Sequence, residues 1–449
     1  MRRTLSIGIT AIMLLLVLAL PVTASDYTLG IFGNANEDET INMQDVTYTE
    51  LIILEYRDKT ELSDAKYDGK INMQDVTQIE LVILGREKEI TILDGNCEVI
   101  TVEKPVERII VEYLDNAELI RALGAKDRVV GVDFIIGKTE IQFPDLSKLP
   151  SLGAMGRPDY EAVLSLNPDL LLTFSGSTAE KKEKLPGVAV VFLGLYYPDL
   201  SNPDGSRFTD GVRKLGYILD ARDEAEEYID WRTGWIDDIK SKTEGLTEDE
   251  KPRVFIWSKP ALPITKTYKT CSSVDTLTQM CNLAGGRSIA KDLPEFVQPV
   301  YQITVDPEWV IEQDPEYILV HTVRYTYGGG TMDTPSGYDV DDPAGVKELR
   351  DAIINCPELA NVAAVETGDV CILSGNFRND ATGGFMGAAY MAKILHPGLF
   401  EDLNPEAIHQ EYLTGYQGLD YDLNEHGVFL YLPIEIDCGI AGIPERYRE

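Results

Sequence analysis

From residue 90 onward, short apolar runs alternate with longer helical patterns, and no other feature of the sequence limits the fold as strongly. The runs expected to form strands cover residues 90–93, 99–102, 108–111, 128–132, 169–174, 253–257, 317–320 and 369–373. Helical periodicity lies between them, as at residues 117–123, 160–166 and 273–284. Strands that alternate with helices are typical of parallel sheets whose faces are covered by helices.

One helical stretch, at residues 206–243, is much longer than a crossover helix needs to be, and no proline interrupts it. The alternation of strands and helices restarts after it. The sequence therefore predicts an α/β fold of two lobes with parallel sheets joined by a long helix. The N-terminal lobe is expected at residues 92–205, the linking helix at residues 206–243, and the C-terminal lobe at residues 244–449.

A seven-residue motif in front of these lobes occurs twice. Residues 41–47 read Ile-Asn-Met-Gln-Asp-Val-Thr, and the same residues return at 71–77. Oxygen-bearing side chains around each copy have the spacing of a twelve-residue calcium loop, whose positions 1, 3, 5 and 12 converge on the ion. The residues expected as metal ligands are Asn34, Asn36, Asp38 and Asp45 in the first loop, and Asp64, Asp68 and Asp75 in the second.

Two residues depart from the calcium-loop pattern. Asn34 stands where an aspartate is usual, which weakens the negative charge of the first loop. Lys66 places a cation at position 3 of the second loop, where it would oppose a metal ion. We therefore expect Ca²⁺ in the first loop and a weak or empty second loop. The alternative is a pair of helices, free of calcium, that is held together by its apolar face.

The first residues predict export. Arg2 and Arg3 precede an apolar run at residues 9–20, and the small residues at 22–24 favour cleavage after this triplet. Residues 1–24 are therefore expected to be a signal peptide. The apolar run is too short for a membrane span, and no cysteine follows it, which disfavours a lipid anchor. We expect the mature chain at the outer face of the cell envelope, in a periplasm-like space or secreted.

Charge and cysteine content limit the partners and the redox chemistry. The chain carries 75 acidic and 40 basic residues, a net charge of -35, and such a surface repels nucleic acids. Six cysteines permit disulfides in an exported chain, but none has the CxxC spacing of a zinc or redox motif. Cys271 and Cys281 are the first pair to test because they are close in sequence. Buried free thiols are the alternative.

Loops that follow strands are the expected ligand-binding elements, because ligands of open α/β sheets lie beyond the carboxyl ends of the strands. Aromatic side chains would stack on a flat or apolar ligand, arginines would pair with its carboxylates, and a histidine would ligate a metal or donate a hydrogen bond. The candidates are Glu112, Tyr113, Asp115, Arg157, Ser175, Trp257, His321, Arg324, Tyr325, Phe377 and Arg378. The alternatives are core positions for the aromatic residues, a structural role for the lone histidine and a helix cap for Arg157.

Stretches of both expected lobes resemble the ABC substrate-binding proteins that capture iron-siderophores, haem and cobalamin. The matching residues are 105–111, 122–132, 149–153, 158–163, 166–171, 283–286 and 314–318. The resemblance covers residues 98–413, and its N-terminal half is the more specific. It implies a class III periplasmic-binding-protein fold that binds a metal-chelate solute between two lobes and delivers it to an ABC permease. It also implies that the long helix is a stiff hinge and that the lobes move little.

The repeat resembles a different family. Residues 28–88 are similar to type I dockerin domains, which carry two such loops with aspartate at position 12 and bind cohesin modules. In that family positions 10 and 11 contribute to the choice of partner. Both copies here have Met-Gln at these positions, Met43-Gln44 and Met73-Gln74, which would permit binding in two orientations.

Two functions are consistent with these features. The first is the extracytoplasmic solute-binding subunit of an ABC importer. The second is a cell-surface assembly component attached through a dockerin–cohesin interaction. An enzyme is not expected, because the sequence has no nucleophile elbow, phosphate loop or HExxH motif.

Overall fold

The computed structural model describes residues 27–154, 156–296, 300–323, 335–378, 380–437 and 439–448. The predicted signal peptide, together with Arg324 and Tyr325, lies outside these residues. Within the described ranges, no helix is both long enough and apolar enough to cross a membrane.

The N-terminal lobe is built on a four-stranded parallel sheet of order β4-β3-β7-β8. The strands are β3 (Ile109–Val111), β4 (Val129–Val132), β7 (Leu170–Thr173) and β8 (Ala189–Phe192). Its helices are α4 (Leu114–Ala122), α5 (Phe134–Lys138), α6 (Tyr160–Ser165) and α7 (Ala179–Lys184). All residues of β3 and β7 are buried, as expected for central strands covered on both faces. The predicted parallel sheet of this lobe is therefore confirmed.

The C-terminal lobe contains a five-stranded sheet of order β11-β9-β13-β14-β15. Strands β11 (Arg287–Ser288), β9 (Arg253–Ser258), β13 (Tyr317–His321) and β14 (Val370–Leu373) are parallel, and β15 (Leu430–Tyr431) is antiparallel to β14. The helices of this lobe are α10 (Thr276–Leu283), α11 (Pro307–Gln313), α12 (Ala344–Ile354), α13 (Ala363–Thr367), α14 (Phe385–Leu395) and α15 (Pro405–Glu411). A hairpin of β10 (Tyr268–Cys271) and β12 (Gln302–Val305) packs beside β9.

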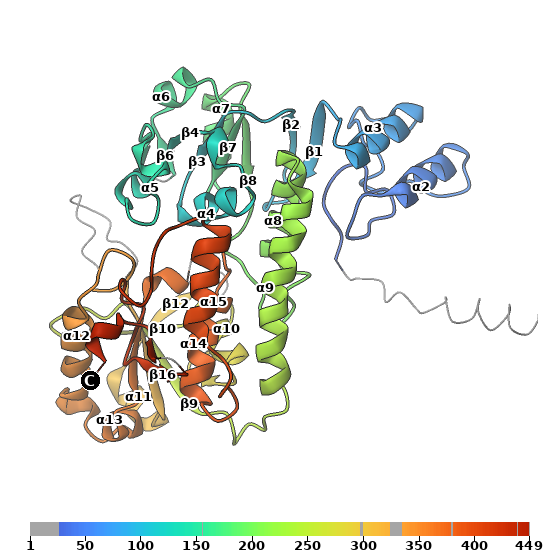
Figure 1. Ribbon diagram of the computed structural model, residues 1–449. Helices are drawn as coiled ribbons and strands as arrows, with labels where there is room; N and C mark the ends of the chain where they lie inside the picture. The colour runs from blue at the N-terminus through green and yellow to red at the C-terminus, as the bar shows by residue number, and fades with distance from the viewer. Residues whose placement is uncertain are drawn as a thin grey trace, which may run out of the picture.

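The single linking helix predicted at residues 206–243 is wrong in one respect: it is two helices, α8 (Arg207–Leu219) and α9 (Arg222–Thr243). Asp220 ends α8 with a backbone φ of 58°, a left-handed conformation that stops a right-handed helix. The helical periodicity continues across this point, so the sequence pattern alone does not reveal it. Helix α9 packs against α4 of one lobe and against α10 and α14 of the other (Figure 1).

The repeated motif forms two helices, α2 (Met43–Ile53) and α3 (Met73–Leu84). Each begins with the same reciprocal cap, Asn42 with Asp45 and Asn72 with Asp75. The hairpin of β1 (Glu89–Leu93) and β2 (Val99–Glu103) lies between these helices and the N-terminal lobe, as Figure 1 shows. The apolar side chains of the repeat and of the lobe belong to one continuous core. We call residues 27–88 the repeat module.

The last part of the chain completes the C-terminal lobe. Residues 416–449, for which the sequence offers no family counterpart, supply the edge strand β15 and a hairpin of β16 (Ile434–Ile436) and β17 (Gly439–Ala441). Helix α14 is almost entirely buried within this lobe.

All five cysteines that the structure describes are free thiols, so the predicted pairing of Cys271 with Cys281 is wrong. Cys271 ends β10, where its Sγ accepts from Gln302, and Cys281 lies on α10 against Gly286. Both thiols are buried, and burial raises the pKa of Cys281 to about 12, so this sulfur stays protonated.

Candidate functional site: the cleft between the lobes

A chain of aromatic rings crosses from one lobe to the other. Tyr113 and Phe174 follow β3 and β7, and their ring centroids are 4.1 Å apart. Phe174 lies 5.7 Å from Tyr196, which follows β8. Tyr196 in turn lies 6.2 Å from Tyr301, which precedes β12 in the C-terminal lobe. The carboxyl ends of three parallel strands therefore direct aromatic side chains toward the opposite lobe.

Arg378 lies at the end of this aromatic chain that is in the C-terminal lobe. Its guanidinium carbon is 5.3 Å from the Tyr196 ring centroid, within the range of a cation–π contact. Nη2 donates to Asp275 Oδ2 at 2.6 Å, and Nε donates to Asp275 Oδ1 at 3.1 Å. Asp275 also caps α10 by accepting from the backbone N–H of Leu277. The arginine is thus held in one orientation by a partner fixed on a helix end.

His321 ends β13 and is 3% exposed. Within the described part of the chain, neither of its ring nitrogens has a hydrogen-bond partner. Burial holds the pKa of the imidazole well below its ordinary range, and the nearby cations Arg378 and Lys259 lower it further. The backbone of Gly375 contacts the ring and raises the pKa in the opposite direction, although the contact lacks the geometry of a full hydrogen bond. A buried imidazole whose nitrogens lack such bonds is costly for folding, which points to a role in binding.

A hollow of about 730 Å³ opens between the lobes beside the aromatic chain. Tyr197 and Tyr301 line it, together with Arg207 and Lys240 of the linking helices and Val274 of the C-terminal lobe. The guanidinium of Arg207 lies 5.6 Å from the Tyr197 ring centroid. Aromatic rings and cations line this hollow together with the carboxylates of Asp199 and Glu244, whereas His321 and Arg378 are not part of its lining.

The first repeat loop has an irregular arrangement at position 1. The Asn34 amide nitrogen donates to the carbonyls of Leu29 and Asp38 at 2.9 and 2.6 Å, and its buried Oδ1 has no partner among the described residues. Asp45 at position 12 accepts from the backbone N–H of Asn36 and Asn42. Burial raises the pKa of Asp45 to about 6. An unpartnered amide oxygen and a buried carboxylate are both groups that a hard cation such as Ca²⁺ would satisfy.

In the second repeat loop, an aspartate at position 1 accepts hydrogen bonds from the backbone of its own loop, as expected. Asp64 accepts from the backbone N–H of Asp68 at 3.1 Å and of Gly69 at 2.7 Å. Lys66 pairs with Glu89 of β1, so a carboxylate already balances the charge that the sequence placed in this loop. Asp75, at position 12, is buried and accepts from the backbone N–H of Lys66 and Asn72. In the described chain, no group of three or more His, Cys, Asp or Glu side chains is placed to hold a metal.

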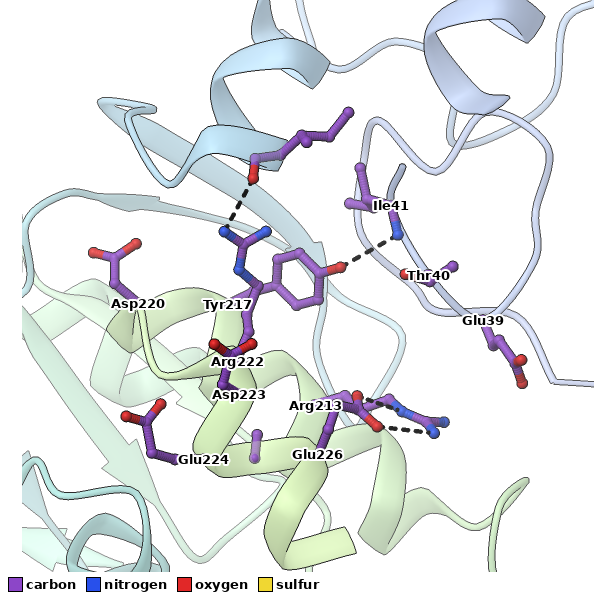
Figure 2. A pocket seen from close by; sticks show the side chains of 12 residues that line it. Glu39, Thr40, Ile41, Arg213, Tyr217, Asp220, Arg222, Asp223, Glu224 and Glu226 are labelled. Carbon is purple, nitrogen blue, oxygen red and sulfur yellow. Dashed lines mark hydrogen bonds and ion pairs between the residues drawn. The ribbon is translucent and has the colours of Figure 1, made fainter. Parts of the chain in front are cut away.

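The repeat module is joined to the linking helices by polar contacts, which Figure 2 shows around a pocket of about 630 Å³. The backbone N–H of Ile41 donates to the hydroxyl of Tyr217 on α8 at 3.2 Å. Arg222 of α9 donates to the carbonyls of Val82 and Ile83 in the last turn of α3. The first repeat loop and the C-terminal end of α3 are therefore both tied to the junction of α8 and α9.

Comparison with known proteins fits this arrangement of two lobes. A family model described as "Periplasmic binding protein" matches residues 109–376. The chain belongs to the periplasmic binding protein family. The match begins at β3 and ends in the segment after β14, so it covers the parallel strands of both lobes and excludes the repeat module. Proteins of this family are the substrate-binding components of transporters and are not enzymes.

One curated relative is the uncharacterized ABC transporter substrate-binding lipoprotein YvrC of Bacillus subtilis (strain 168). It is 27% identical over 219 residues, which is 46% of this chain and 63% of that protein. The match thus spans less than two thirds of the relative's own length.

Two solved structures have a similar fold. The TroA-like periplasmic binding protein FepB of Veillonella parvula matches with a TM-score of 0.60 and 18% identity, over 77% of this chain and 99% of that one. The molybdate-bound MolA of Haemophilus influenzae matches with a TM-score of 0.57 and 18% identity, over 74% of this chain and 99% of that one. At these identities the similarity shows the fold alone.

Several predicted ligand residues of this periplasmic binding protein lie away from the cleft surface. Glu112 is buried within the N-terminal lobe, where it pairs with Lys181 at 2.5 Å and accepts from the Thr173 hydroxyl at 2.8 Å. Asp115 is buried in the first turn of α4. Trp257 stacks on Tyr268, and Phe377 on Tyr390, in the core of the C-terminal lobe. Arg157 is exposed on the short strand β6 (Arg157–Pro158).

The structure brings together four of the predicted residues and adds others that the sequence reasoning missed. Tyr113, Ser175, His321 and Arg378 follow or end the strands whose carboxyl ends face the cleft. The missed residues are Phe174, Tyr196, Tyr197, Lys259, Asp275 and Tyr301. The rule that selected loops after strands would also cover Tyr196 and Tyr197, which follow β8, but no strand was predicted at residues 189–192. No sequence signal marks Tyr301, because it precedes a strand and reaches the cleft only through the β10–β12 hairpin.

Proposed function

We propose that this chain is the extracytoplasmic substrate-binding subunit of an ABC importer, and that it captures a metal-chelate solute between its lobes. The observation that carries the proposal is His321, a buried imidazole with no hydrogen-bond partner among the described residues, next to Arg378 and Lys259. Family membership supports the class of function. The solutes we consider are an iron-siderophore, haem and cobalamin.

The chemistry of the cleft favours a solute that is both flat and anionic. Aromatic rings offer faces on which a macrocycle or a catecholate can stack. Lys259 provides positive charge for carboxylates or phenolates, and the charge of Arg378 is balanced by Asp275, while the whole chain has a net charge of -35. A neutral imidazole can ligate a metal or donate a hydrogen bond. Together these groups match an anionic metal chelate.

The proposal is tested by titration of the purified protein with haem, cobalamin and a ferric siderophore, followed by fluorescence and visible absorption. Molybdate forms a fourth arm, because the structurally similar MolA binds it. We expect micromolar or tighter binding of one chelate and a clear loss of affinity in Arg378→Ala. Binding of molybdate alone would replace the chelate with a small oxyanion. Binding of none of the four would contradict the proposed solute class.

A second candidate function is cell-surface assembly through the repeat module. The observation that favours it is the matched exposure of Met43 and Met73, which are 59% and 57% exposed at the first position of α2 and α3. Exposed methionines at equivalent positions suit a partner that binds in either of two orientations. Pull-down with a purified cohesin module tests this function. Retention by the wild type but not by Met43→Asp/Met73→Asp supports it, and equal retention contradicts it.

We also propose that the repeat module binds Ca²⁺, with the first loop as the expected site. The unpartnered amide oxygen of Asn34 and the buried carboxylate of Asp45 support this proposal. The pairing of Lys66 with Glu89 weakens the reason for excluding the second loop, so both loops belong in the test. Calorimetric titration of Asp45→Asn and Asp75→Asn separates them. The first-loop assignment predicts that only Asp45→Asn abolishes binding.

A further inference from the structure

A buried carboxylate joins the two lobes at a point distant from the repeat module. Glu118 lies on α4 of the N-terminal lobe and is 1% exposed. Its Oε2 accepts from the backbone N–H of Ala381, in the C-terminal lobe, at 2.7 Å. The same oxygen accepts from the hydroxyl of Tyr412 at 3.0 Å. The other oxygen, Oε1, accepts from the side-chain amide of Gln142.

The linking helix holds the same segment of the C-terminal lobe from another side. The Tyr228 hydroxyl of α9 donates to the carbonyl of Ala381 at 2.7 Å. Nε of Arg232, one turn later, donates to the carbonyl of Thr382 at 2.9 Å. The backbone of Ala381 and Thr382 is therefore bonded to the N-terminal lobe through one N–H and to α9 through two carbonyls.

This segment is also the continuation of the cleft wall. Arg378 stands three residues before Ala381, and α14 begins at Phe385. Gly383 and Gly384 lie just before α14, and their φ values of 62° and 87° are ones that non-glycine residues rarely adopt. A Cβ at Gly383 would lie 3.0 Å from Nη2 of Arg232. The turn is thus specified by its own sequence and pressed against α9.

We propose that Glu118 is a positioning residue that fixes the spacing of the two lobes. By bonding the amide of Ala381 it ties the segment that carries Arg378 to α4, whose first turn lies next to Tyr113. The two walls of the cleft are then held at one separation before any solute arrives. A buried carboxylate holds its donors firmly in place. Water cannot replace a hydrogen bond that is lost there, so any movement that breaks one leaves a buried polar group unsatisfied and costs free energy.

The consequence for affinity rests on the proposed binding function, whereas the consequence for lobe movement does not. Hydrogen exchange followed by mass spectrometry on the solute-free protein therefore tests the inference directly. Glu118→Gln keeps the shape of the side chain but replaces one acceptor oxygen with a donor. We expect exchange in peptides that span residues 380–388 to become faster by about tenfold, the equivalent of one lost hydrogen bond.

Glu406→Gln is the matched control. Glu406 is also buried, and it accepts the backbone N–H of Gly442 at 3.1 Å, but both partners lie in the C-terminal lobe. This variant is expected to leave exchange at residues 380–388 unchanged. Equal exchange there in wild type and Glu118→Gln, or an equal increase in the control, would overturn the inference.

A milder variant guards against misfolding. Tyr412→Phe removes only the hydroxyl that donates to Glu118 and keeps the ring that stacks on Trp231. We expect an increase in exchange at residues 380–388 that is smaller than that of Glu118→Gln. No increase in Tyr412→Phe, together with loss of folding in Glu118→Gln, would show a purely structural role and would also overturn the inference.

Discussion

Arg378 and Asp275 form a two-pronged ion pair in which Nη2 and Nε of the guanidinium donate to the two carboxylate oxygens at 2.6 and 3.1 Å. Asp275 is fixed as the N-cap of α10, and Arg378 follows the short helix after β14. Two segments separated by about a hundred residues of sequence thus meet at the cleft. The pair presents a cation to the aromatic chain with little freedom of orientation.

The first prediction concerns this ion pair. Asp275→Asn removes the carboxylate that faces a buried cation, so the free energy of unfolding is expected to fall by about 3–5 kcal/mol. Chemical denaturation measures the change. The matched control is Glu248→Gln, whose pair with Lys251 is on the surface, and it should leave the free energy of unfolding nearly unchanged. A loss in Asp275→Asn as small as that of the control would contradict a buried pair.

The second prediction separates the stability and binding roles of His321. His321→Leu removes two unpartnered ring nitrogens from a buried site, so the variant is expected to be more stable than the wild type by about 1–3 kcal/mol at pH 7.5. Its affinity for the solute should decrease at the same time. A variant that loses both stability and affinity would mean that the histidine is a packing residue.

The third prediction concerns how the difference in stability between wild type and His321→Leu depends on pH. Folded His321 stays neutral because burial, with Arg378 and Lys259 nearby, depresses its pKa. Unfolded histidine titrates near pH 6.5, so below that pH the unfolded chain takes up the proton and the stability of the wild type falls by up to about 1.4 kcal/mol per pH unit. The stability advantage of His321→Leu should therefore grow as the pH falls from 6.5 to 5.

Buried carboxyl groups change the stability in the opposite direction as the pH falls. Their contribution has to be removed before the effect of His321 can be measured. Burial raises the pKa of Asp133 to about 7, so this group stabilises the folded chain as the pH falls. Because wild type and variant share Asp133, the difference between their denaturation curves isolates the histidine. A difference that is constant between pH 7.5 and pH 5 would contradict the depressed pKa.

The fourth prediction concerns the repeat module. Asp45 has a pKa of about 6 in the folded chain, so protons compete with Ca²⁺ for it below that pH. We expect millimolar Ca²⁺ to raise the melting temperature at pH 7.5, and to raise it much less at pH 5. Asp45→Asn should abolish the calcium response. Differential scanning calorimetry with and without a chelator makes both measurements.

The fifth prediction is that the repeat module and the N-terminal lobe unfold together. The ammonium of Lys104 is 2% exposed and bonds the carboxylate of Glu87, the carboxylate of Asp220 and the carbonyl of Tyr217. Lys104→Met leaves Glu87 buried without its cation, at a cost of about 3–5 kcal/mol. Lys66→Met, which breaks a half-exposed pair with Glu89, should cost less than about 1 kcal/mol.

Calorimetry also distinguishes a docked module from a tethered one. A single shared core predicts one cooperative transition for the module and the lobe, shifted to lower temperature in Lys104→Met. Two separate transitions in the wild type would contradict the docking.

The elements with the strongest local patterns could be predicted from the sequence. The runs at residues 169–174 and 317–320 are strands because they are mainly apolar and bounded by turn residues. The twin helices after residues 42 and 72 follow from an identical cap in identical sequence. The break between α8 and α9 could not be predicted, because Asp220 adopts a left-handed conformation within an otherwise unbroken helical pattern.

The candidate site also contains residues that could be predicted from the sequence and residues that could not. Tyr113, His321 and Arg378 could be proposed because a sheet places the ends of its parallel strands on one edge. Glu112 looked equally suitable, yet Lys181 and Thr173 enclose it, and both contacts depend on how α7 and β7 pack. Tyr301 and Asp275 carry no local signal, since their positions depend on the β10–β12 hairpin and on the start of α10.

The sequence by itself determined the order of strands and helices, the two lobes and the internal repeat, because periodicity and capping act over a few neighbouring residues. The tertiary structure decided which polar side chains became internal pairs and which faced the cleft. That division depends on contacts between residues far apart in the chain. Glu118 with Ala381 and Lys104 with Asp220 are such contacts, since the energy of a buried charge is set by the partners that packing brings to it.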